Sequence, residues 1–283
     1  MKYFDLHSDT PYKCYKENLD FFENVLSVSA QKGRVFEKWS HFFAVWIKDD
    51  LENPYENYRK IIDSFKLKIK DKPSNLTPYF SLEGGSAIED KPYRLYELKD
   101  DGIKLINLTW NGENLLAGGV NTQKGLTDLG KLVLKEMNRL KIGCDVSHLN
   151  EKSFFAAAEY ADYIIASHSN CKSICPDKRN LTNEQIKLIA EKGGIIGICF
   201  YPLFLGEGDV YEQVYKHIYH ICDMGLENHI AIGSDFDGAD MEKELKDIKA
   251  IPRLCEYLRD KGMGDGLLDK IFFENANNFI AKL

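Results

Sequence analysis

The sequence contains no run of about 18 consecutive apolar residues, the length that a helix needs to cross a bilayer. Its first residues also lack the basic segment and the apolar stretch that together make a secretory signal. Instead, the stretch YFDLH from Tyr3 to His7 has the pattern of a β-strand. We therefore expect a soluble chain that begins near Met1, has no membrane partner and resides in the cytoplasm.

Basic residues are fewer than acidic ones, and the cysteines show no pairing pattern. Lysine and arginine number 37 against 44 aspartates and glutamates, the formal net charge is −7, and no basic stripe stands out. This balance argues against a nucleic acid as partner and favours a small or peptide ligand. The seven cysteines form an odd number without the spacing of a disulfide framework, as expected of free thiols in a reducing compartment.

No low-complexity tract, long linker or internal repeat divides the chain, so residues 1–283 are expected to form a single domain. Short apolar or β-branched runs predict eight strands, at residues 3–7, 41–47, 78–83, 103–109, 142–147, 163–167, 195–200 and 230–234. Segments with helical spacing lie between them, including a capping box formed by Thr182 and Gln185. This alternation predicts an α/β fold, a (β/α)8 TIM-type barrel, rather than a doubly wound sheet.

The first predicted strand carries Asp5, His7 and Asp9 at every second position. Alternate side chains of an extended strand share a face, so three polar groups that can bind metal would lie on one side of this element. Asp5 would point the same way as His7 and Asp9 but one layer deeper. We therefore expect Asp5 to have a structural or supporting role rather than to bind a metal directly.

In barrels of this type the functional residues lie at the C-terminal ends of the strands. Here several predicted strands close on ionisable side chains, and three of only seven histidines are among them. The first strand ends in His7 and Asp9, the third in Glu83, the fifth in His148, the sixth in His168 and the eighth in Asp235. Imidazole and carboxylate groups together suit zinc and similar divalent ions, and their number is enough for two metal ions that share a bridging ligand.

The ordered motifs resemble those of the membrane (renal) dipeptidase family, zinc peptidases related to the amidohydrolase barrels. They are DLHSDT, SLEGG, INLTWN, CDVSH, SHSNCKSICPDKRN and GSDFDG, and they extend over nearly the whole chain. The resemblance implies two zinc ions held by five side chains: His7 and Asp9 on one ion, His148 and His168 on the other, and Glu83 bridging both.

For the reaction, the resemblance implies a binuclear zinc dipeptidase that hydrolyses the peptide bond of dipeptides by a metal-bridging hydroxide. Asp235 would take the proton from that nucleophile and pass it to the leaving amine. Arg179, in the stretch DKRN, would bind the substrate carboxylate, because a guanidinium presents two parallel donors that match a carboxylate. Members of the family often dimerise, so a homodimer is a further expectation.

Two alternatives remain open at this point. Another amidohydrolase-type enzyme, such as a lactonase, phosphotriesterase or deaminase, would use the same metals, but many of those bridge them with a modified lysine at the end of strand four. The only lysine of that strand, Lys104, stands at its start. The second alternative is a barrel that binds metal or peptide without turnover, and the intact ligand set with Asp235 counts against it.

One residue departs from the family pattern. In renal-type enzymes a histidine closes strand four and steadies the carbonyl oxygen of the tetrahedral intermediate, and this chain has Trp110 there. An indole offers one N–H donor and no nitrogen that titrates. Trp110 would therefore bind substrate either as a hydrogen-bond donor or as an aromatic wall of the pocket.

Overall fold

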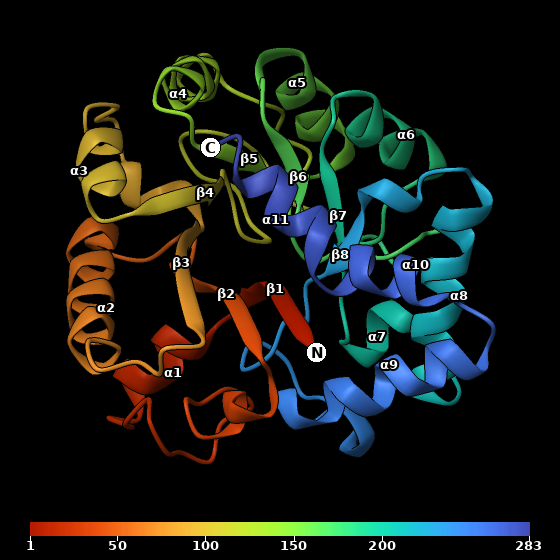
Figure 1. Cartoon of the computed structure of the whole chain (residues 1–283). Helices are drawn as coiled ribbons and strands as arrows, with labels where there is room; N and C mark the ends of the chain where they lie inside the picture. The colour runs from red at the N-terminus through yellow and green to blue at the C-terminus, as the bar shows by residue number, and fades with distance from the viewer.

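Each of the eight apolar runs forms a strand, and the strands pair in chain order until β8 meets β1 and closes a parallel barrel (Figure 1). The computed structural model describes residues 1–283. The strands are β1 (Lys2–Ser8), β2 (Lys38–Trp46), β3 (Leu76–Glu83), β4 (Ile103–Asn107), β5 (Gly143–Asp145), β6 (Ile164–Ala166), β7 (Ile195–Ile198) and β8 (Ile230–Ile232). The predicted (β/α)8 barrel is thus confirmed.

Helices alternate with the strands and surround the barrel (Figure 1). They are α1 (Thr10–Lys16), α2 (Pro54–Lys68), α3 (Arg94–Asp100), α4 (Asp128–Arg139), α5 (Glu151–Tyr160), α6 (Asn183–Glu191), α7 (Pro202–Leu205), α8 (Val210–Asp223), α9 (Ile251–Asp260), α10 (Asp265–Asp269) and α11 (Asn275–Ile280). The predicted capping box is present at the start of α6, where the Thr182 hydroxyl accepts from the backbone N–H of Gln185 and the Gln185 side chain accepts in return. None of the helices combines the length and the apolar character needed to cross a membrane.

The alternation of side chains along the strands divides the apolar residues between two cores. The larger core lies between the strands and the helices and includes Tyr3 and Phe43. The smaller core fills the inside of the barrel and includes Phe4, Phe42 and Leu105. Burial of each such side chain stabilises the fold by about 1.5 to 3 kcal/mol, so the strands are fixed from both faces.

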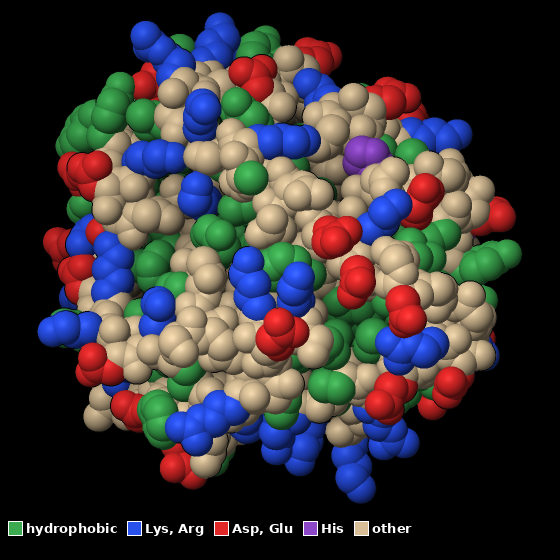
Figure 2. All heavy atoms as spheres, viewed as in Figure 1, with side chains coloured by type: hydrophobic (Ala, Val, Ile, Leu, Met, Phe, Trp, Pro, Cys, Tyr) green, Lys and Arg blue, Asp and Glu red, His purple; other side chains and the backbone are tan.

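The C-terminal segment closes the end of the barrel at which the strands begin. Phe273 and Phe279 belong to the core inside the barrel, and Asn275 donates to the backbone carbonyls of Glu227 and Ile230 at the start of β8. Figure 1 shows α11 lying across this opening, close to the N-terminus. Acidic and basic side chains are interspersed on the same face, without a large patch of either sign (Figure 2). The opposite end, where the strands finish, is therefore the end available for a site.

β1 differs from the prediction at Asp5. The Asp5 carboxylate accepts from the Tyr3 hydroxyl at 2.7 Å and from two backbone N–H groups at 3.2 and 2.9 Å. The pairing of β1 with β2 shifts in register between Asp5 and Ser8, so the strict alternation is interrupted in this segment, and Asp5 lies with Tyr3 on the side of the larger core. Asp9 lies beyond the strand, at the start of α1. The expectation that Asp5 shares a face with His7 and Asp9 is therefore wrong, while its three hydrogen bonds support a structural role.

A buried histidine connects α8 to two loops of the barrel. His217 Nδ1 accepts from the backbone N–H of Cys171 at 3.1 Å, and Nε2 donates to the Leu205 carbonyl at 3.0 Å. This pair of bonds needs the neutral ring, because one nitrogen must accept. Burial lowers the pKa of His217 to about 4, and burial has the same effect on the pKa of His41.

We therefore expect the contribution of His217 and His41 to the free energy of unfolding to fall as the pH drops from about 6.5 to about 4. In this window the unfolded chain, whose histidines have an ordinary pKa of about 6.5, binds protons that the folded chain does not bind. His217 accounts for a loss of about 2 kcal/mol between pH 7 and pH 5. His217→Gln should be less stable than the wild type at pH 7 and should lose less stability on acidification, measured by urea denaturation at both pH values. Equal losses in the two proteins would contradict the assignment.

Candidate metal centre and active site

The ionisable residues predicted from the strand ends meet at one end of the barrel. They are His7 in β1, Asp9 at the start of α1, Glu83 at the end of β3, His148 and His168 in the turns after β5 and β6, and Asp235 in the turn after β8. Each has an exposed fraction of 9% or less. A cavity of about 730 Å³ opens beside them, and Arg179 and Trp110 line it too. The structure thus brings all eight predicted site residues together.

Glu83 lies at the centre of this arrangement. The ligand atoms of His7, Asp9 and Glu83 lie within 4.8 Å of one another, and so do those of Glu83, His148 and His168. Glu83 Oε1 is 2.6 Å from His148 Nε2, and Glu83 Oε2 is 3.4 Å from His7 Nε2. Its two oxygens therefore face two different histidines, which is the arrangement that a bridging carboxylate requires.

His148 and His168 are oriented by partners outside the cluster. His148 Nδ1 lies 2.9 Å from Asn111 Oδ1, and His168 Nδ1 lies 2.8 Å from the hydroxyl of Ser167. An amide oxygen can only accept, so His148 carries its proton on Nδ1 and presents the lone pair of Nε2 to the site. The two Nε2 atoms are 2.8 Å apart. Two ring nitrogens that converge in this way can act together as ligands of one metal ion.

The negative charges of the clustered carboxylates are only partly neutralised by other residues of the protein. Burial, together with the nearby Asp9, raises the pKa of Glu83 to about 8, and burial raises the pKa of Asp235 to about 7. Although burial opposes it, the charges of Glu83 and Asp9 raise the pKa of His7 well above its ordinary value. His7 Nδ1 and Asp9 Oδ1 are buried without a partner. Three carboxylates beside imidazole nitrogens are a donor set that fits one or two divalent ions such as zinc.

Arg179 is not an exposed loop residue. Its side chain is buried, lies over the ring of Phe204, and places Nη2 at 3.3 Å from both the His168 carbonyl oxygen and His148 Nε2. Its Nε atom has no hydrogen-bond partner. A buried guanidinium with a free donor beside the carboxylate cluster is suited to bind an anionic group of a substrate.

Trp110 belongs to the long loop between β4 and α4 and forms part of an aromatic wall. Its ring meets Trp46 edge to face at a centroid distance of 5.2 Å and lies 6.4 Å from His148. Asp49 anchors this loop by accepting from the backbone N–H groups of Trp110 and Gly112 at 3.0 and 2.8 Å. The loop therefore presents Trp110 to the cavity from a fixed position.

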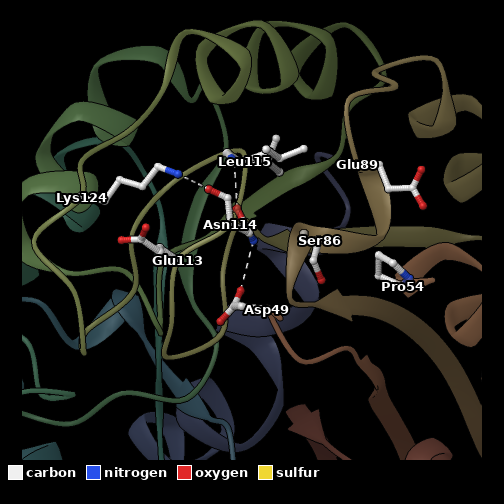
Figure 3. Close-up of a pocket in the computed structure, with 10 residues that line it drawn as sticks. Asp49, Pro54, Ser86, Glu89, Glu113, Asn114, Leu115 and Lys124 are labelled. Atoms are coloured by element: carbon white, nitrogen blue, oxygen red, sulfur yellow. Dashed lines mark hydrogen bonds between the residues drawn. The ribbon is translucent and has the colours of Figure 1, made fainter. Parts of the chain in front are cut away.

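Asp49 lies in a second hollow of about 360 Å³, which is also lined by Glu89, Glu113 and Asn114 among others (Figure 3). Figure 3 shows the Asn114 side chain reaching to Asp49, and the distance from Asn114 Nδ2 to Asp49 Oδ1 is 3.1 Å. No histidine or cysteine lines this hollow. The Asp49 carboxylate is already engaged by the loop, so the chemistry belongs to the larger cavity.

Four residues that support the cluster were not identified from the sequence. They are Asn111, Asp145, Ser147 and Ser167. Three of them adjoin a predicted site residue, and Asp145 is in the same CDVSH motif as His148. Small polar residues next to a strand end are common in turns, so only their contacts reveal what they do.

A closed parallel barrel with imidazole and carboxylate groups gathered at the C-terminal ends of its strands is an architecture found in metal-dependent hydrolases. Within that class, the chain belongs to the membrane dipeptidase family, peptidase family M19, whose family model matches residues 50–282. Membership places it among the peptide-bond hydrolases and confirms the family resemblance seen in the motifs.

The chain is similar to proteins from several organisms. It is 35% identical over 209 residues to an uncharacterized protein from the pqqA 5′ region of Klebsiella pneumoniae, which covers 69% of this chain and 77% of that protein. It is 30% identical over 210 residues to an uncharacterized dipeptidase of Schizosaccharomyces pombe, which covers 71% of this chain and only 51% of the yeast protein. A metallo peptidase from Rhodobacter sphaeroides has the same fold, with a TM-score of 0.87 at 23% identity over 100% of this chain and 99% of that one.

We expect metal binding to depend on Glu83 more than on any single histidine, because its two carboxylate oxygens face two different histidines, His148 and His7. Glu83→Ala, loaded with zinc and freed of excess metal by gel filtration, should retain at most one ion per chain in elemental analysis. Glu113→Ala is the matched control, since this carboxylate lines the second hollow and should leave metal content unchanged. Two ions retained by Glu83→Ala would rule out a bridging role.

Proposed function

We propose that this protein is a binuclear zinc dipeptidase. The observation that carries the proposal is the position of Glu83, whose two oxygens face His148 on one side and His7 on the other. His7 and Asp9 would hold one ion, and His148 and His168 the other. Bound zinc would supply a Lewis acid that polarises the peptide carbonyl and lowers the pKa of water.

The choice of a dipeptide as substrate has two further supports. The Rhodobacter sphaeroides peptidase, which shares the fold, has been solved with a phosphinate mimic of the dipeptide L-Ala-D-Ala. In this chain, Arg179 lies 3.3 Å from His148 Nε2, so a carboxylate bound to Arg179 would stand close to the proposed metal centre. Such proximity would leave room for about one residue between the terminal carboxylate and the scissile bond.

The alternative of a lysine-bridged amidohydrolase gains no support from the barrel. β4 ends at Asn107, and Lys104 lies near the start of that strand, away from the cluster. Glu83, at the end of β3, would bridge the metal ions instead. A cytoplasmic location and a homodimer stay predictions.

Asp235 would move the proton of the reaction. Its Oδ1 lies 4.0 Å from His7 Nε2, and its Oδ2 accepts from the thiol of Cys199 at 3.8 Å. The backbone at Asp235 has a φ of +65°, and its N–H donates to the His7 carbonyl at 3.2 Å, which holds the side chain over the cluster. This carboxylate would take a proton from the attacking water and return it to the departing amine.

Trp110 and Arg179 would position the substrate from two walls of the cavity. Trp110 and Trp46 form an aromatic wall, where an apolar side chain of the substrate would pack. The guanidinium of Arg179 would bind the C-terminal carboxylate. A histidine at position 110 would offer a titrating nitrogen to the carbonyl oxygen, whereas the indole of Trp110 offers at most one neutral N–H.

The substrate assignment is tested with zinc-loaded enzyme, Ala-Ala dipeptides and the corresponding dipeptide amides. The wild type should cleave the acid far better than the amide, and Arg179→Lys should raise KM for the acid more than it lowers kcat. The reason is that a bidentate contact made in both the ground and transition states contributes uniform binding. Equal cleavage of acid and amide by the wild type would refute the role of Arg179, and cleavage of a lactone or phosphotriester in preference to any dipeptide would refute the proposed function.

Asp235→Asn should bind zinc normally and lose activity by about 100- to 10,000-fold, because the amide keeps the shape of the side chain but cannot take up a proton. Asp237→Asn is the control, since Asp237 accepts from Thr10 and the backbone of Ser27 rather than facing His7. Steady-state kinetics and metal content should be measured for both variants. If Asp237→Asn is the inactive protein and Asp235→Asn turns over, the general base is the other aspartate of this loop.

A further inference from the structure

A buried chain of hydrogen bonds runs from His168 down into the barrel. His168 Nδ1 lies 2.8 Å from the Ser167 hydroxyl, which lies 3.4 Å from the Ser147 hydroxyl, which in turn donates to Asp145 Oδ1 at 2.8 Å. All four side chains have exposed fractions of 3% or less. The chain connects the turn after β6 with β5, two neighbouring strands of the barrel.

The position of each proton in this series of hydrogen bonds follows from Asp145, its last member. Asp145 Oδ1 also accepts from the backbone N–H groups of Ser147 and Ser167 at 3.1 and 3.0 Å, so this oxygen is an acceptor for three donors. Ser147 must then use its only proton for Asp145, and its oxygen accepts from the backbone N–H of His168 at 3.1 Å. Ser167 consequently donates to Ser147 and accepts from His168 Nδ1.

We propose that Asp145 is a positioning residue for the metal centre, which acts through Ser147 and Ser167 to fix His168 as the Nδ1–H tautomer with its Nε2 lone pair directed at the metal. The buried negative charge at the end of the chain makes His168 a more basic ligand and offsets part of the positive charge of a bound ion. Since this role presupposes the zinc site of the proposed function, the two need separate tests.

The three histidines of the cluster differ in the partner of their Nδ1 atom. His7 Nδ1 is buried without a partner, and His148 Nδ1 meets the neutral amide of Asn111, which belongs to a loop. Only His168 is backed by a carboxylate through side chains of the barrel itself. The two proposed zinc sites are therefore unequal, and the one that contains His168 depends on Asp145.

The first test measures zinc affinity by competition with a chromophoric chelator, starting from metal-free protein. Ser167→Ala should weaken one site by about 10- to 100-fold and leave the other unchanged. Ser81→Ala is the matched control, because Ser81 is another buried serine of the barrel and its hydroxyl has no partner. Wild-type affinity at both sites in Ser167→Ala would overturn the proposal.

A double-mutant cycle shows whether Asp145 and Ser167 act through one series of hydrogen bonds or affect the site independently. Asp145→Asn keeps the size of the side chain and removes its charge, so it should weaken the same site. Combined with Ser167→Ala it should add little further loss, because the chain is already broken. Full additivity of the two losses would overturn the connection through Ser147.

The second test needs neither zinc nor turnover. Nitrogen-15 spectra of the histidine rings in metal-free protein, assigned with His168→Asn, should show the His168 proton on Nδ1 in the wild type and in Ser81→Ala. Ser167→Ala should lose this preference. A wild-type His168 with its proton on Nε2 would refute the role of Asp145 whether or not the protein binds zinc, whereas a correct tautomer in a protein that binds no zinc would refute only the proposed function.

Discussion

The burial of several carboxylates in one small volume is the constraint on which the rest of the site depends. Asp9, Glu83 and Asp235 lie around His7 at the mouth of the barrel, and burial raises the pKa values of Glu83 and Asp235. Like charges so close together are costly unless a cation compensates them. Divalent metal ions offset that cost, and the same ions supply the chemistry of peptide hydrolysis. The electrostatic strain of the site and its proposed function thus have one origin.

The barrel makes this arrangement possible because one of its ends is filled by apolar side chains and the other carries the charged cluster. Aromatic and aliphatic side chains fill the interior at the end where the strands begin, and Phe273 and Phe279 of the C-terminal segment complete that core. The apolar plug stabilises the fold independently of the charged cluster, which lies at the other end. Ligands carried on strands or in the short turns after them are held more precisely than ligands on long loops. Stability and chemistry are therefore placed in separate layers of the same barrel.

The supports of the cluster are as specific as the cluster itself. Asp49 holds the loop that carries Trp110, Asn111 orients His148, and Asp145 orients His168 through two serines. Each of these contacts joins different βα units, so the geometry of the site depends on the correct pairing of the whole barrel. Hydrogen bonds of this kind set which nitrogen of a histidine faces a metal, and thereby decide whether a nearby imidazole can bind it.

The sequence by itself determined the eight strands and the residues that close them, because apolar runs and alternation reflect which side chains must be buried. It also placed Glu83, His148, His168 and Asp235 at one mouth, because parallel strands in a barrel all end on the same side. Only the tertiary structure decided the side on which Asp5 lies, because a register shift in β1 breaks the alternation. The partners of His148 and His168 also came only from the fold, because hydrogen bonds between residues 20 to 40 positions apart leave no periodic pattern in the chain.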